Sequence, residues 1–146
     1  TSLLELGAGL GVPGLAAAAA GCDVTLSDYE ELILDFERVS AAASKLDNVD
    51  CMMLDWKNPP EMRRYDIIVG AEILFREEFF KPLLNVMRRA LKPEGVIFLA
   101  HDVRRQSLQP FLEMAQEEYN ISASKKTLRS LEEDRVIIMN RLVPKK

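Results

Sequence analysis

Short apolar runs alternate with longer amphipathic segments along most of the chain. The apolar runs have the length of strands and fall at residues 2–6, 23–27, 49–54, 65–70 and 95–101. The segments between them space their apolar residues as helices do, which predicts helices over residues 12–20, 30–46, 77–91 and 105–119. This alternation is typical of βαβ units, so the pattern predicts an α/β fold with a mostly parallel sheet and helices on both faces.

The C-terminal stretch departs from this pattern. Residues 121–126 and 135–142 both favour β structure, and the charged segment between them is too short for a crossover helix. We expect an antiparallel hairpin that completes a seven-stranded sheet. The LKPEG segment, residues 91–95, is predicted to end the third helix as a turn. No linker divides the chain, so residues 1–146 are predicted to form a single domain, and the start at a strand without methionine predicts a further N-terminal segment.

Composition and charge narrow the functional classes. The formal net charge is -4 and the basic residues are scattered in pairs, so we expect no nucleic-acid partner. No run approaches the roughly 20 apolar residues that span a bilayer, and no signal peptide is recognisable. These features predict a cytoplasmic protein without a membrane partner. The two cysteines, Cys22 and Cys51, are too few for a disulfide framework or a zinc site; we expect reduced core thiols and no metal.

A glycine-rich segment, ELGAGLGVPG at residues 5–14, links the first predicted strand to the first predicted helix. Gly7, Gly9 and Gly11 allow a sharp turn and a close approach of backbone to a ligand. Amide groups at the start of the helix favour an anionic group such as a phosphate or carboxylate. A tight turn without a ligand is the alternative interpretation.

The same segment also satisfies the dinucleotide pattern G-x-G-x-x-G through Gly9, Gly11 and Gly14. Two observations argue against NAD. Gly7 is the first glycine after the strand, which shifts the other three out of the usual register. Glu5 at the strand end would repel a pyrophosphate but attract an ammonium group.

Three successive predicted strands end in an acid, and these ends meet at the sheet edge where α/β proteins bind ligands. Asp28 lies 21 residues after Gly7, close to the spacing at which an acid accepts the hydroxyls of a ribose. After the third strand, Asp55 is suited to accept from an adenine amino group and Trp56 to cover the ring. A solvated turn for Asp28 and core packing for Trp56 are the alternatives.

With these residues in view, the chain resembles the seven-β-strand (class I) S-adenosylmethionine-dependent methyltransferases. More narrowly, it resembles the methyltransferase-like protein lysine methyltransferases, the group that includes the enzyme acting on valosin-containing protein. The matching segments are residues 3–28, LDW at 54–56, YDIIVGAEILF at 65–75, PLL at 82–84 and LKPEGVIFLA at 91–100. The resemblance implies a Rossmann-like fold, S-adenosylmethionine as cofactor, S-adenosylhomocysteine as product and a protein lysine as methyl acceptor.

The resemblance also assigns roles to residues. It places Glu5 near the methionine ammonium, Gly7, Gly9 and Gly11 near the methionine moiety, Asp28 at the ribose, Asp55 and Trp56 at the adenine, and Ala71 in the pocket wall. Where the family carries an Asp-x-x-Tyr motif, this chain has Glu72 and Phe75. We expect Glu72 to orient the amine or take its proton, and Phe75 to supply an aromatic wall. A helix cap for Glu72 and a core position for Phe75 are the alternatives, and His101 is expected to be an ordinary strand-end residue.

Two other functions share the same cofactor residues. One is methyl transfer to the nitrogen or oxygen of a small molecule, and the other is a cofactor-binding domain without catalysis. The intact glycine segment and Asp28 argue against the second. The sequence does not define the oligomeric state.

Overall fold

A computed structural model describes all 146 residues and contains one seven-stranded sheet in the order β3-β2-β1-β4-β5-β7-β6. The strands are β1 (Ser2–Leu6), β2 (Asp23–Asp28), β3 (Val49–Met53), β4 (Tyr65–Ala71), β5 (Leu91–Asp102), β6 (Tyr119–Leu128) and β7 (Arg135–Pro144). The first five strands pair in parallel, whereas β7 is antiparallel to both β5 and β6. This topology confirms the predicted sheet with its antiparallel C-terminal hairpin.

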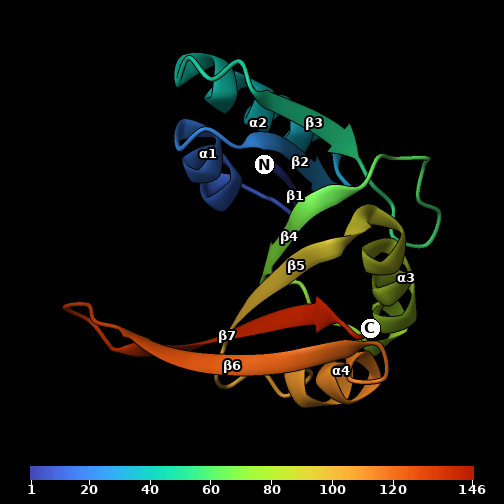
Figure 1. Ribbon diagram of the computed structural model, residues 1–146. Coiled ribbons are helices and arrows are strands. Elements are labelled where there is room, and N and C mark those ends of the chain that lie inside the picture. The colour runs from blue at the N-terminus through green and yellow to red at the C-terminus, as the bar shows by residue number, and fades with distance from the viewer.

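Four α-helices and one short 3-10 helix connect the strands. They are α1 (Val12–Ala19), α2 (Glu31–Ala43), η1 (Glu77–Phe79), α3 (Phe80–Ala90) and α4 (Leu108–Ala115). Helices α1 and α2 pack beside β1, β2 and β3, whereas α3 and α4 lie beside the other half of the sheet (Figure 1). None of the helices has the length and apolar character needed to cross a membrane.

The central strand β1 shows how the two helical layers are held. Leu4 and Leu6 belong to the large core cluster that also contains Phe111 of α4. Leu3 belongs to the smaller cluster with Ala18 of α1. Successive side chains of a strand point to opposite faces of the sheet, so β1 contributes to both clusters. Each fully buried leucine stabilises the fold by about 2 kcal/mol, and together the two clusters fix helices on both faces.

Two predicted element boundaries were wrong. The fourth helix covers only Leu108–Ala115 instead of residues 105–119. Residues 91–95, predicted as a turn, are the start of β5, and Leu91 pairs with Tyr65 before a register shift. Leu91 is buried because Gly95 leaves room for it: a Cβ at Gly95 would lie 2.5 Å from Leu91 Cδ1. Packing across the shifted register therefore overrides the turn-forming sequence.

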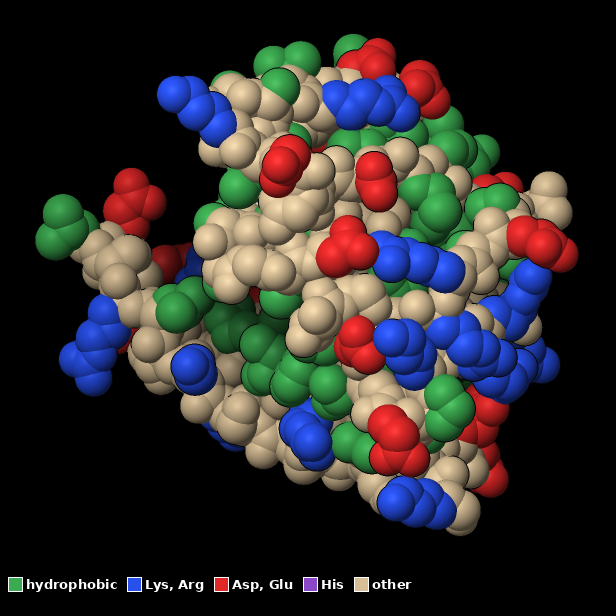
Figure 2. Space-filling model, turned by 45° about the horizontal axis from the view of Figure 1, so that its top comes forward, with side chains coloured by type: hydrophobic (Ala, Val, Ile, Leu, Met, Phe, Trp, Pro, Cys, Tyr) green, Lys and Arg blue, Asp and Glu red, His purple; other side chains and the backbone are tan.

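The C-terminal hairpin extends beyond the rest of the sheet. Strands β6 and β7 pair over their whole length, but β5 pairs with β7 only over residues 137–142. The remaining part projects as an arm (Figure 1), and acidic, basic and hydrophobic side chains crowd its tip in Figure 2. Arg135 marks the start of β7, where the arm leaves the body.

Candidate active site

A cavity of about 510 Å³ opens at the carboxyl ends of β1, β2 and β4, the edge at which α/β sheets bind ligands. Its lining residues are Gly7, Asp28, Tyr29, Glu30, Leu54, Asp55, Trp56, Lys57, Ala71, Glu72, Ile73, Phe75, Arg76 and Phe79. Among the predicted site residues, Glu5, Gly9 and Gly11 are the three that do not line it. We call this space the strand-end cavity.

The glycine segment forms one wall of the strand-end cavity. Gly7, Gly9 and Gly11 have φ angles of 57°, 55° and 74°, in the left-handed region that disfavours side chains. Gly7 also faces a crowded wall, because a Cβ there would lie 3.0 Å from Ile73 Cγ2 and 3.8 Å from Trp56 Cζ2. The bare backbone at Gly7 therefore keeps space open at the cavity wall.

Asp28 joins this segment to the end of β2. Its Oδ2 accepts the backbone N–H of Gly9 at 3.1 Å, and its Oδ1 accepts those of Tyr29 at 2.8 Å and Glu30 at 3.2 Å. A carboxylate offers about four acceptor positions, so it can still accept from a ligand hydroxyl. Asp28 is therefore held in place at the cavity by Gly9, Tyr29 and Glu30, and its role as an acceptor for a ribose stays a prediction.

Glu5 lies behind the cavity wall. It is buried, and its Oε1 accepts the backbone N–H of Gly14 in α1 at 2.8 Å. Burial raises the pKa of Glu5 to about 7, and the bond from Gly14 opposes that shift. In this position Glu5 anchors the start of α1 to β1, and its predicted approach to an ammonium group stays a prediction.

A further buried acid, Glu37 of α2, was not predicted. Its side chain is fully buried, and neither carboxylate oxygen has a hydrogen-bond partner. Burial, followed by the charges of Asp28 and Glu5, raises the pKa of Glu37 to about 7. The sequence signal was its helical spacing with Leu34 and Ala41, which places all three on the buried stripe of α2.

Glu72 lies directly after β4, the strand that pairs with β1 next to the glycine segment. Its φ of 54° is unusual for a residue with a side chain and costs on the order of 1 kcal/mol. Its N–H donates to the carbonyl of Ala100 at 2.9 Å, and its carboxylate accepts the backbone N–H of Asp102. Arg105 completes the arrangement, with Nε at 2.7 Å and Nη2 at 2.6 Å from Glu72 Oε2. These contacts rule out the helix-cap alternative, since no side chain caps η1 or α3.

Aromatic side chains form the wall next to Glu72. Phe75 is 57% exposed, so the core alternative is wrong. Its ring centroid lies 6.1 Å from that of Phe79, which in turn lies 5.9 Å from that of Trp56. The Nζ atom of Lys57 lies 4.8 Å from the centroid of the Phe79 ring. This wall therefore already holds one ammonium group by a cation–π contact.

His101 does not line the strand-end cavity. It is fully buried in β5, and neither ring nitrogen has a hydrogen-bond partner. Burial lowers its pKa to about 4, so the ring is neutral at pH 7. This placement agrees with the ordinary strand-end residue that the sequence predicted.

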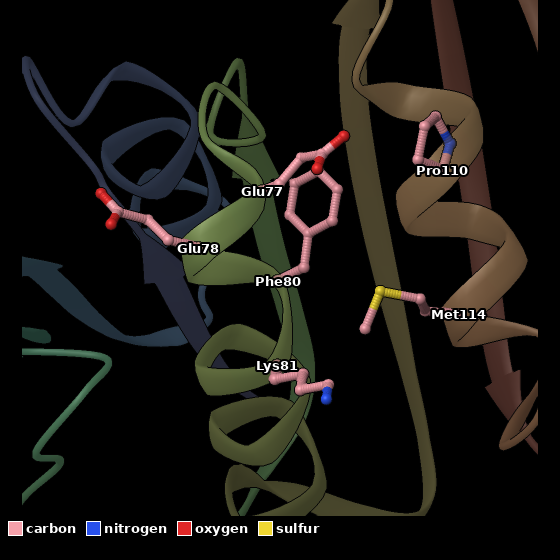
Figure 3. A pocket seen from close by; sticks show the side chains of 6 residues that line it. All are labelled: Glu77, Glu78, Phe80, Lys81, Pro110 and Met114. Carbon is pink, nitrogen blue, oxygen red and sulfur yellow. The ribbon is translucent and has the colours of Figure 1, made fainter.

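A separate depression of about 400 Å³ lies between α3 and α4 (Figure 3). Glu77 and Phe80 point toward α4 in that view, whereas Glu78 points away. Phe80 is buried, and its ring centroid lies 5.4 Å from that of Phe111. The depression shares no residue with the strand-end cavity and follows a packing seam between helices, so the strand-end cavity is the candidate active site.

Comparison with protein families agrees with this geometry. Residues 1–118 match a family described as lysine methyltransferase. This chain belongs to the lysine methyltransferase family. The match covers β1 to α4, and so contains every residue of the strand-end cavity.

Individual relatives in the family differ in the acceptor that their names state. The chain is 35% identical over 127 residues to the Protein N-lysine methyltransferase METTL21A of Xenopus tropicalis, covering 84% of this chain and 59% of that protein. It is 37% identical over 89 residues to the Histone-arginine methyltransferase METTL23 of Rattus norvegicus, covering 57% of this chain and 40% of that protein. The chain thus spans about half the length of these relatives.

Solved structures share the fold at low sequence identity. The glycopeptide N-methyltransferase MtfA, solved in complex with S-adenosyl-L-homocysteine, superposes with a TM-score of 0.70 at 15% identity. The superposition covers 99% of this chain and 83% of that one. This likeness confirms that the chain has the predicted Rossmann-like class I methyltransferase fold.

Proposed function

We propose that this protein binds S-adenosylmethionine in the strand-end cavity, transfers its methyl group to a lysine side chain of a protein, and releases S-adenosylhomocysteine. One observation carries the proposal: a single cavity joins the polar groups suited to the cofactor with the acid and aromatic wall suited to an amine. Membership of the lysine methyltransferase family supports the same chemistry.

The residues on the glycine side fit the cofactor. Asp28 would accept the ribose hydroxyls, because three backbone N–H groups already hold its carboxylate in place. Asp55 and Trp56 would hold the adenine; Asp55 Oδ1 accepts the N–H of Lys57 at 3.0 Å, which leaves Oδ2 for an amino group. Gly7 would let the methionine moiety approach backbone, with Ala71 in the same wall. Gly9, Gly11 and Glu5 would act by shaping and anchoring this segment.

The residues on the other side fit a lysine. When bound, S-adenosylmethionine would supply an electrophilic methyl group, which the amine would take up while sulfur leaves as the neutral thioether of S-adenosylhomocysteine. Glu72 would orient the amine and take its proton, since Arg105 and Asp102 fix the carboxylate at the rim. Phe75 and Phe79 would line the path of the cationic chain. The chain's part in catalysis would therefore be alignment, exclusion of water and acceptance of the amine proton by Glu72.

The proposal also covers the setting of the reaction. We treat residues 1–146 as one methyltransferase domain and place it in the cytoplasm, which the free thiols of Cys22 and Cys51 support. A small-molecule acceptor would need the same cofactor residues and is the main competing function. An arginine acceptor is the other competitor, because one relative is named for it.

Incubation with tritiated S-adenosylmethionine and cell lysate tests the proposal. We expect label in protein bands, and methyl-lysine after hydrolysis to amino acids. Label found only in the small-molecule fraction would show that the acceptor is a small molecule. Label found only as methyl-arginine would show that the acceptor is arginine and not lysine. Calorimetry supplies the cofactor control: tight NAD binding without any response to S-adenosylmethionine would overturn the cofactor assignment.

A further inference from the structure

A second cavity of about 560 Å³ adjoins the strand-end cavity and shares Glu72 with it. Its other lining residues are Asp102, Arg104, Arg105, Arg135 and Ile137. We call it the arginine groove. The end of β5 and the start of β7 form it together, and the N–H of Val103 donates to the carbonyl of Val136 at 2.9 Å between them. Three guanidinium groups therefore line this cavity together with Glu72.

The two adjoining cavities carry opposite charge. The arginine groove contains three arginines and two carboxylates, an excess of one positive charge. The strand-end cavity contains four carboxylates and two basic side chains, an excess of two negative charges. Glu72 is common to both and lies where the sign changes. The rim therefore presents a negative site for an amine beside a positive site for an acid.

Arg135 is the guanidinium in the groove that is least engaged within the chain, since its one ion pair, with Glu133, is not accompanied by a hydrogen bond. Arg104 makes two bonds of 2.9 Å to the carboxylate of Asp102, and Arg105 is bound to Glu72. Arg135 makes no hydrogen bond; its nearest carboxylate is that of Glu133, at 3.8 Å, and its side chain is 62% exposed. A guanidinium offers five donors in a planar fork that matches a carboxylate, so its donors are unused here.

We propose that the arginine groove binds an aspartate or glutamate of the protein substrate, close in sequence to the target lysine, chiefly through Arg135. This inference rests on the proposed function. A lysine with a neighbouring acid matches both charged cavities at once. A lysine with basic neighbours would place like charges beside Arg135, which disfavours binding.

Methylation of synthetic peptides tests this selectivity. Each peptide has one central lysine in a glycine and serine background, and a single aspartate is moved through every other position; a matched series carries asparagine. We expect at least one position where aspartate raises kcat/KM about two- to fivefold over asparagine, the range for an ion pair at a solvent-exposed site. Arg135→Glu should abolish this preference, whereas Arg89→Glu, the same charge change at an exposed residue of α3, should keep it.

A binding measurement makes the test independent of turnover. The side-chain Nε–Hε resonance of Arg135 in NMR spectra should shift with the aspartate peptide and not with the asparagine peptide. Methylation of lysine without any effect of Arg135→Glu, or with no preference for aspartate, overturns the inference and leaves the proposed function standing. If the Arg135 resonance shifts with the aspartate peptide but no peptide or lysate protein is methylated, the proposed function is wrong. If the Arg135 resonance does not shift with the aspartate peptide, the inference that the arginine groove binds an acid is wrong.

Discussion

The two sides of the strand-end cavity are built in different ways. On the cofactor side, Asp28 is bound by its own neighbours, Tyr29 and Glu30, and by Gly9 of the glycine segment. On the acceptor side, Glu72 is bound by Asp102 and Arg105, which follow in sequence after a further helix and strand. The contact between Gly9 and Asp28 thus spans 19 residues, whereas the contacts of Glu72 with Asp102 and Arg105 span 30 and 33 residues.

The two sides of the strand-end cavity are expected to differ in how well they tolerate substitutions. In the proposed function the cofactor side would present the same contacts to one invariant ligand, and its left-handed glycines leave little tolerance for substitution. The proposed acceptor side is exposed at Phe75 and adjoins the arginine groove, so we expect changes there to alter the partner while the cofactor contacts remain. Substitutions on the two sides should therefore affect different measured quantities.

The largest effect is expected on the acceptor side. Glu72→Gln should lower turnover on the order of 10²-fold, because the amide keeps the size but loses the charge and the proton acceptor. Cofactor affinity should stay nearly intact, which separates the two sides in one variant. Rate at saturating cofactor and cofactor Kd are the two measurements. Glu94→Gln, at an exposed position of β5, is the matched control; a normal rate in Glu72→Gln would remove Glu72 from the reaction.

On the cofactor side, Asp28→Ala should weaken S-adenosylmethionine binding by more than about tenfold, since hydrogen bonds to a charged acceptor contribute about 1.5 to 3 kcal/mol. The variant also releases the N–H groups of Gly9, Tyr29 and Glu30. Calorimetry measures the Kd, with Asp50→Ala on β3 as an exposed acidic control. An unchanged Kd would show that Asp28 only stabilises the turn after β2 and does not contact the cofactor.

Beneath the cofactor side, Glu37→Leu should raise the free energy of unfolding by about 1 to 2 kcal/mol at pH 8, because it removes a buried charge without partners. The raised pKa means that folded Glu37 binds its proton more tightly than the unfolded chain does. Its ionisation therefore lowers stability as the pH rises from about 4.5 to about 7, and the penalty is complete above that range.

Urea unfolding across pH measures this effect. In Glu37→Leu the free energy of unfolding should fall less between pH 4.5 and pH 7 than in the unmodified protein. The remaining fall should come from Glu5, whose pKa is also raised to about 7. Glu113→Leu makes the same change at an exposed site of α4 and should not alter the pH dependence. A less stable Glu37→Leu protein would show that the carboxylate has a favourable partner.

The smallest effect is expected at the aromatic wall. Phe75→Leu should raise KM for a lysine peptide about two- to fivefold, because an exposed cation–π contact contributes about 0.5 to 1 kcal/mol. Cofactor Kd should not change. Phe36→Leu, at an exposed site of α2, is the matched control. A change in cofactor Kd without a change in KM for the peptide would show that Phe75 contacts the cofactor. The two sides of the strand-end cavity would then not be separate.

The predictions from sequence succeeded where the signal was local. The apolar runs gave the seven strands, and the acids at the strand ends located the cavity through Asp28 and Asp55. They failed where distant residues decide. Residues 91–95 read as a turn but form part of β5, because Leu91 pairs with Tyr65 and fills the space over Gly95. Arg105 was not predicted as the partner of Glu72 for the same reason.

By itself the sequence determined the fold class, because hydrophobic periodicity acts between residues close in the chain. It also predicted the residues of the cofactor side from a local glycine pattern, and their roles toward the cofactor stay predictions. Only the tertiary structure decided that Glu72 is held by Arg105, that Glu37 is buried without a partner, and that Arg135 stands beside the cavity. The positions of Glu72 and Arg135 depend on the register of β4 against β5 and of β5 against β7, whereas the burial of Glu37 depends on the packing of α2 against β2 and β3. That register follows from the packing of the whole core, which no local pattern of residues encodes.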